Sequence, residues 1–392
     1  MIKLSTDNKP FGFTVDQDKF SSILSTIKNL AGNEGSFYII CEQKELWVAA
    51  SSSMFIGALK VEATEVIDQG QFGFNADLIQ GVTKGRAAIK FNFTGSECEF
   101  KAIKTKYAGK IVTIPITKEQ ASCVNDGLNE KSKSIKLSPD VLIAISNGIT
   151  STSLVNLVDK QKCNSYIDIE ENKIVVSSFD EYHMMLYSNK VKCDEKVKFS
   201  INPQTMGIIQ KAINGKFELS VKKESIRFSG KDFIIIVPTV QADDAKYAVA
   251  SSYIRSLGKN PIFSASVDTK ALMDTCMNLD TIHTANSQFD LELESKGFAV
   301  RFVTEQGSAE DTIGAEEKQG QGMCSLNPKG FMDMLGCVKM HGATSVEVAA
   351  HESVCYVKAN KKGSRLEGVC VLTANSSSNK EKSKSDKKKD KK

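Results

Sequence analysis

The chain lacks the features that mark membrane, secreted and wholly disordered proteins. Its 392 residues include only 7 prolines and 26 glycines, which excludes collagen-like and low-complexity chains. No segment approaches the ~20 apolar residues that a membrane helix needs. The longest apolar run, 233–237, has the length of a strand, and the first residues hold no apolar core typical of a secretory signal. We therefore expect a globular protein of the cytoplasm, without membrane contact.

Motifs of common catalytic and metal sites are absent as well. The sequence contains no GxxxxGK[ST] phosphate loop, no HExxH pair and no GxSxG turn. Its ten cysteines are scattered without a CxxC pair, so neither a zinc site nor a disulfide framework is indicated. We expect most of these thiols to be buried as small apolar residues. The sequence thus predicts a protein that is not an enzyme and that needs no cofactor and no metal.

Excess positive charge is confined to one end of the chain. Residues 376–392 contain eight lysines against three acidic residues, whereas the rest of the chain has 43 basic and 44 acidic residues. Such a segment cannot bury a core, so we predict a disordered Lys-rich tail over 375–392. A body that is nearly neutral is not expected to bind nucleic acid through its overall charge.

A threefold repeat organises the body of the chain. Each copy has a short extended stretch, an Asn, a helical apolar period, a Gly and then alternating strands. Asn75, Asn202 and Asn327 are 127 and 125 residues apart. Asn favours a helix N-terminus because its side chain accepts from free amides of the first turn, and Pro203 and Pro328 preset that turn. The period-two segments that follow are typical of half-buried strands.

Each copy is preceded by a similar half-unit, so the chain reads as strand, helix and three strands repeated six times. We predict an α+β fold of three domains, each with two helices packed on antiparallel sheets. Their expected limits are 1–120, 132–245 and 260–374. The polar segments near 119–132 and 243–260 show no sustained period and are interpreted as linkers.

Over about residues 11–374 this pattern resembles the bacterial beta-type DNA sliding clamp, including its bacteriophage relatives. The segment 178–184, SFDEYHM, is similar to the family's Thr-Asp-Gly-His-Arg-Leu stretch in the middle domain. The resemblance implies a head-to-tail homodimer, domain 1 against domain 3, that forms a ring around duplex DNA. It also implies a DNA polymerase as partner and a cytoplasmic location at the nucleoid or replication site. An ATP-driven clamp loader is implied too, because the chain has no nucleotide site of its own.

In such a ring the helices line the hole, so their polar residues are candidates for facing DNA. The candidate DNA-facing residues are Lys19, Lys28, Lys84, Arg86, Gln210, Lys211, Lys270, Lys329 and Lys339. Charges opposite an apolar helix face can also be merely solvated. A weakly attractive wall suits sliding, since each neutralised phosphate adds affinity.

The resemblance further implies a cleft between the middle and last domains that receives a short apolar peptide from polymerases and loaders. The candidate pocket residues are Phe179, Tyr182, His183, Met184, Ala245, Ala250, Val369 and Val371. Aromatic and Met side chains suit such a site because they adapt to several ligands. Met184, Val369 and Val371 could equally be ordinary core residues.

Two other functions are consistent with the sequence. The chain could be an open or monomeric processivity factor that holds DNA through its basic tail. It could also be a structural protein of repeated domains, such as a virion or scaffold component. A closed two-chain ring predicts a solution mass of twice the 42.8 kDa of one chain.

Overall fold

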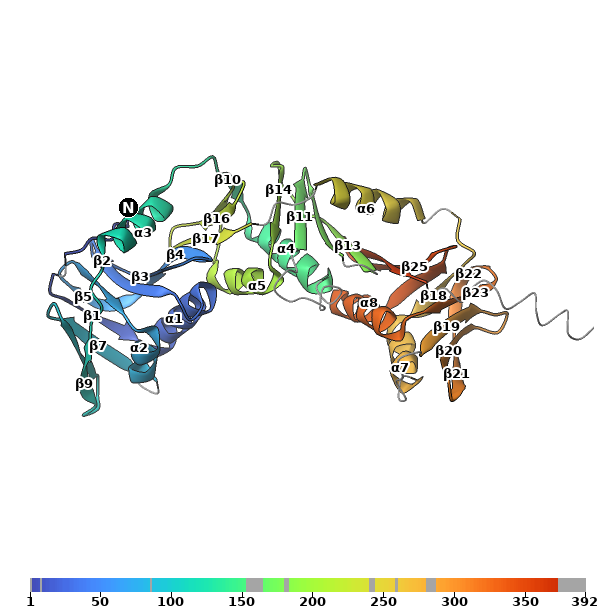
Figure 1. Cartoon of the computed structure of the whole chain (residues 1–392), viewed down its shortest axis with the longest axis horizontal. Helices are drawn as coiled ribbons and strands as arrows, with labels where there is room; N and C mark the ends of the chain where they lie inside the picture. Colours follow the sequence, from blue (N-terminus) through green and yellow to red (C-terminus); the bar gives the residue numbers. More distant parts are fainter. Residues whose placement is uncertain are drawn as a thin grey trace, which may run out of the picture. The chain divides into compact units, whose positions relative to one another are not determined.

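The computed structural model describes residues 2–7, 9–84, 87–152, 165–179, 183–239, 244–257, 260–279 and 287–372. The chain forms two compact units (Figure 1). One comprises Met1–Leu142 with Gln204–Gln241, and the other Ile143–Pro203 with Ala242–Lys392. Among the described residues there are eight helices, and none has the length and apolar content needed to cross a bilayer.

The first unit contains two antiparallel sheets. The five-stranded sheet has the order β5 (Ala63–Ile67), β1 (Phe11–Asp16), β7 (Ala88–Phe93), β8 (Glu97–Ala102) and β9 (Ala108–Val112). The eight-stranded sheet has the order β10 (Ile135–Leu137), β15 (Phe217–Val221), β16 (Ser225–Ser229), β17 (Phe233–Pro238), β4 (Phe55–Val61), β3 (Glu45–Ser52), β2 (Ser36–Glu42) and β6 (Gly70–Phe74). The helices are α1 (Gln17–Ala31), α2 (Ala76–Thr83), α3 (Lys118–Asn129) and nearly all of α5 (Pro203–Ala212).

The second unit also contains two antiparallel sheets. The nine-stranded sheet has the order β14 (Val197–Ile201), β11 (Ser165–Glu170), β12 (Lys173–Phe179), β13 (His183–Lys190), β26 (Ser364–Val371), β25 (Val354–Lys361), β24 (Ser345–Ala350), β18 (Phe263–Asp268) and β22 (Ala315–Gly320). The four-stranded sheet has the order β21 (Gly307–Ile313), β20 (Phe298–Thr304), β19 (Gln288–Leu293) and β23 (Gly322–Leu326). The helices are α6 (Asp244–Leu257), α7 (Thr269–Leu279), α8 (Pro328–His341) and most of α4 (Pro139–Thr152).

The repeated helix-start pattern is confirmed at two of its three asparagines. The Asn75 side chain accepts from the backbone amides of Asp77 and Leu78, at 2.9 and 3.1 Å. The Asn327 side chain accepts from the amide of Gly330 at 3.2 Å, with proline at the first helical position. The predicted apolar face of α8 is fully buried; it consists of Phe331, Met334, Leu335 and Val338. Local sequence chemistry therefore sets where these helices begin and which side faces the core.

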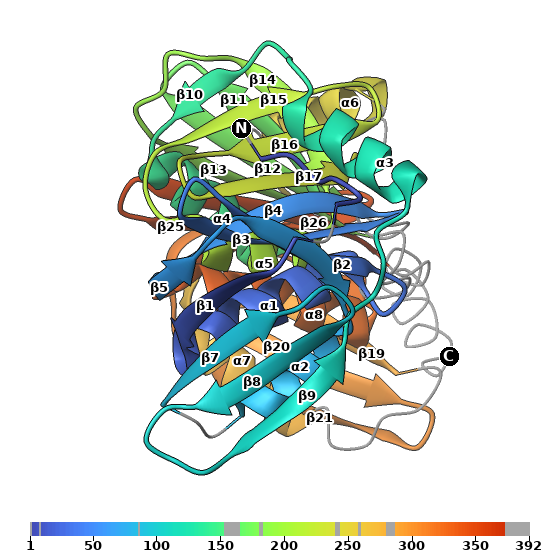
Figure 2. The ribbon, with the colours of Figure 1, turned by 90° about the vertical axis from the view of Figure 1, so that its left-hand side faces the viewer.

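The segment 119–132, interpreted from the sequence as a linker without a sustained period, is mostly helical and contains α3. Thr117 and Gln120 form a capping box at its start. Ala121, Val124 and Leu128 are buried against β3 and β4, on the sheet face opposite α1 (Figure 2). The helix was missed because only this narrow stripe is apolar while the rest of its surface is polar.

The second linker, 243–260, is likewise mostly helical, since it contains α6. Two strands were also absent from the predicted pattern, β5 and β22. Both are edge strands, and all but one residue of β22 is exposed. Polar side chains on an edge strand disfavour pairing with other chains, so such strands lack the alternation of apolar and polar residues.

The cysteines behave as small apolar residues, as predicted. Eight of the nine that the structure describes are buried, and only Cys123 is exposed. Burial raises the pKa of Cys41 to about 11. A buried thiol with a raised pKa is a poor nucleophile, so a structural role fits these residues.

Arg227 on β16 secures the end of α3. Its guanidinium donates to the backbone oxygens of Gly127 and Leu128, at 2.9 and 2.8 Å. Arg227→Gln should leave these carbonyls unsatisfied and cost about 1.5–3 kcal/mol of local stability. We expect faster amide hydrogen exchange across α3, whereas Lys223→Gln at an exposed neighbouring position should leave exchange unchanged. Equal exchange in the two variants would show that this contact does not hold the helix.

Candidate nucleic-acid and partner interfaces

In the first unit, the predicted DNA-facing lysines of α1 are engaged with carboxylates. Lys19 pairs with Glu62, and Lys28 pairs with Asp77 at the start of α2. The hydrogen bond to Glu62 raises the pKa of Lys19, so this lysine stays charged. Because the paired carboxylates offset their charge, both lysines attract phosphate less than free lysines would.

Helices α1 and α2 of this unit lie side by side. Gln80 of α2 donates to the hydroxyl of Ser25 of α1 at 2.9 Å, and the hydroxyls of Ser21 and Thr83 are 3.3 Å apart. Lys84, the C-cap residue that follows α2, is exposed. Of the other candidates here, Gln210 and Lys211 lie near the end of α5, and Arg86 lies outside the described residues.

In the second unit, α7 and α8 pack against each other and carry three predicted DNA-facing lysines. Lys270 lies in the first turn of α7, and Lys329 and Lys339 lie near the two ends of α8. All three are exposed, and none forms an ion pair within the described parts of the chain. These lysines are therefore the better candidates for attracting a phosphate backbone.

The structure brings four of the predicted pocket residues onto one face of the nine-stranded sheet. Phe179 on β12 is directly opposite Met184 on β13, which is directly opposite Val369 on β26. Val371 lies two residues along β26 and so points to the same face. Phe179 and Met184 are half-buried, Val369 is buried, and Val371 is 48% exposed. We call these four residues the apolar row.

His183 does not belong to the apolar row. It precedes Met184 on β13, and consecutive strand residues point to opposite faces. Its ring packs against α8, where a Cβ at Gly330 would collide with it. Tyr182 and the side chains of Ala245 and Ala250 lie outside the described residues.

The apolar row is partly covered by the chain's own helix α6. Ile254, with 1% of its surface exposed, belongs to a buried cluster with Val369, and Met184 and Leu257 pack against that cluster. Helix α8 packs on the other face of the same strands (Figure 1). This helix was not predicted from the sequence, although Ile254 and Leu257 have the i, i+3 spacing of one helix face.

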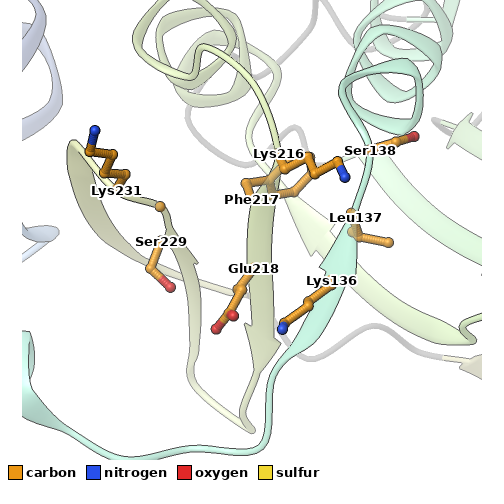
Figure 3. A pocket seen from close by; sticks show the side chains of 9 residues that line it. Lys136, Leu137, Ser138, Lys216, Phe217, Glu218, Ser229 and Lys231 are labelled. Carbon is orange, nitrogen blue, oxygen red and sulfur yellow. The ribbon is translucent and has the colours of Figure 1, made fainter.

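A separate hollow of about 650 Å³ lies in the first unit, beside β10, β15 and β16 (Figure 3). Three exposed lysines line it, Lys136, Lys216 and Lys231, together with Glu218. Glu218 accepts a hydrogen bond from the Ser134 hydroxyl at 2.9 Å. We call the hollow lined by these three lysines the lysine hollow.

The fold is similar to that of solved sliding clamps over more than nine-tenths of the chain. A DNA polymerase sliding clamp from Bacillus subtilis aligns with a TM-score of 0.74 over 93% of this chain and 99% of that chain, at 12% identity. The beta subunit of DNA polymerase from Streptococcus pyogenes aligns with a TM-score of 0.76 over 92% and 99%, at 10% identity. No protein-family model matches the sequence, and no curated protein matches it either.

The chain therefore has the fold of the DNA polymerase sliding clamp along nearly all of its described length. The similar structures are, more particularly, bacterial beta subunits, and they include that of DNA polymerase III from Thermotoga maritima. That structure aligns with a TM-score of 0.73 over 93% of this chain and 99% of that chain, at 14% identity. The fold expected from the sequence resemblance is confirmed.

Ile254 is the main buried anchor that the described part of α6 provides. Ile254→Ala should cost about 2–5 kcal/mol, because a buried branched side chain is lost and a cavity remains. We expect faster hydrogen exchange in 251–257 and in the strands of the apolar row. Tyr253→Ala is the matched control, since Tyr253 is 40% exposed. If Ile254→Ala exchanges like the wild type, the helix is held by other contacts.

Proposed function

We propose that this protein is a DNA sliding clamp, a processivity factor that encircles duplex DNA and tethers a replicative DNA polymerase. The main support is the extent of the structural match. It takes in 93% of this chain and 99% of the Bacillus subtilis clamp. A module shared by chance would match only a part of each chain.

The proposed working form is a head-to-tail homodimer with the first clamp domain of one chain against the third domain of the other. We propose the three domains at 1–120, 132–245 and 260–374. Such a ring retains DNA by enclosing it, so it needs no strong grip on the phosphates. The near balance of charge outside the tail and the ion pairs of Lys19 and Lys28 fit this requirement.

The apolar row is the proposed docking site for polymerase and loader peptides. Phe179, Met184 and Val369 form adjacent cross-strand neighbours, and Val371 keeps an exposed apolar edge beside them. Apolar side chains that are only partly covered have surface left to bury against a partner. Because the chain contains no phosphate-loop motif, a separate ATP-driven loader would open the ring at replication sites.

A closed ring is recognised by its dependence on DNA topology. We expect a solution mass twice that of the 42.8 kDa chain. After loading on nicked circular DNA, the protein should stay bound, and it should be lost when the circle is linearised. An open factor held by its tail would dissociate from both forms as salt rises, and a structural protein would bind neither. Either result would exclude the ring.

The exposed lysines of α7 and α8 should supply the attraction to DNA in the second unit. Replacing Lys270, Lys329 and Lys339 by Ala should weaken DNA binding and make its dependence on log salt shallower, by up to about 0.9 for each phosphate that is no longer neutralised. The same change at Lys101, Lys223 and Lys296, which lie on strands or turns, is the control. Equal weakening in both sets would indicate general attraction instead of a helical wall.

A further inference from the structure

The face of the nine-stranded sheet that carries α6 continues beyond the apolar row into a cluster of cations. The cations are Lys173 on β12, Lys190 on β13 and Arg365 on β26. Each is two or four residues along its strand from an apolar residue of that face, namely Val175, Leu186 or Val369. An even separation along a strand places two side chains on the same face. With Arg255 of α6 these cations line a hollow of about 470 Å³. We call this hollow, defined by these four cations, the basic groove.

The strand register places like charges against each other in this groove. Lys173 is directly opposite Lys190 on the neighbouring strand. Such a pair destabilises a sheet by itself, so its presence needs a compensating contact. Glu170 lies 3.8 Å from Lys173 and compensates only partly, because that pair is also solvent-accessible.

One carboxylate lines the groove, and it is already engaged. Glu367 accepts a hydrogen bond from the Tyr356 hydroxyl at 2.9 Å and lies 3.8 Å from Arg365. Lys190 and Arg255 form no ion pair within the part of the chain that the structure describes. The groove therefore has an excess of positive charge that its own residues do not balance.

The groove extends across three strands. Adjacent strands are about 4.8 Å apart, so the backbones of β12 and β26, with β13 between them, are about 10 Å apart. A peptide with several carboxylates can reach cations on all three strands at once. The guanidinium groups of Arg255 and Arg365 also match carboxylates with two parallel hydrogen bonds.

The position of the groove favours a protein partner over nucleic acid. It lies on the α6 face, whereas α8, with the lysines proposed to face DNA, packs on the other face of these strands. Leu186 in its lining adds apolar surface that a peptide can contact. The geometry points to a docking groove for a short acidic segment of a partner protein. This inference does not depend on the chain encircling DNA.

A labelled hexaglutamate peptide, with hexaglutamine as the neutral control, tests the groove in the full-length chain. Binding is measured by fluorescence anisotropy at about 150 mM salt, where weak surface attraction is screened. Lys190→Glu with Arg365→Glu should weaken hexaglutamate binding by about tenfold or more. The matched control is Lys216→Glu with Lys231→Glu in the lysine hollow, and it should change binding by less than about twofold. Both double variants keep the Lys-rich tail, so the tail cannot cause a difference between them.

Equal loss in the two double variants, or equal binding of the two peptides, would overturn the inference. Zero-length carbodiimide crosslinking with peptide mapping gives a second readout on the wild-type chain, so it holds even if a variant fails to fold. Crosslinks to Lys173 or Lys190 are expected, and crosslinks confined to the tail lysines would contradict the groove. A duplex oligonucleotide whose binding falls by the same factor in the groove variant would assign the groove to nucleic acid.

Discussion

Pairing of strand edges between sequence repeats is the constraint on which this structure depends. An unpaired edge strand exposes backbone donors and acceptors and invites aggregation. Here β17 pairs with β4 over Phe233–Ile236, and β13 pairs with β26 over His183–Asn189. These two pairings join segments that are far apart in the sequence into continuous sheets. The pairing of β13 with β26 also places Met184 beside Val369. The apolar row therefore exists only because these two edges are joined.

Much of the fold could be predicted from local sequence chemistry. The caps at Asn75 and Asn327, the buried stripe of α8 and the alternating strands all reflect short-range rules, and they were identified correctly. Helices α3 and α6 were missed because their apolar stripes are narrow, and β5 and β22 because polar edge strands lack alternation. Which strands join across repeats could not be read from the sequence, since an edge strand carries no local signal of its partner.

The candidate sites show the same division between local and long-range information. Phe179, Met184 and Val369 were proposed from a family resemblance, and the strand register places them together. His183 was included through its position in the same segment. The alternation of side chains along a strand already excludes His183 and Met184 from sharing a face. The basic groove was not foreseen, because its cations come from three strands and a helix that is absent from the predicted pattern.

Helix α6 also stores length in the connection between β17 and β18. Its 14 residues span about 21 Å as a helix, at 1.5 Å per residue. Fully extended, the same residues would reach about 46 Å. Unwinding would therefore more than double the reach of this tether, at the cost of freeing Ile254 and Leu257 from their cluster. How far the connection between β17 and β18 can extend therefore depends on how firmly Ile254 is held in its cluster.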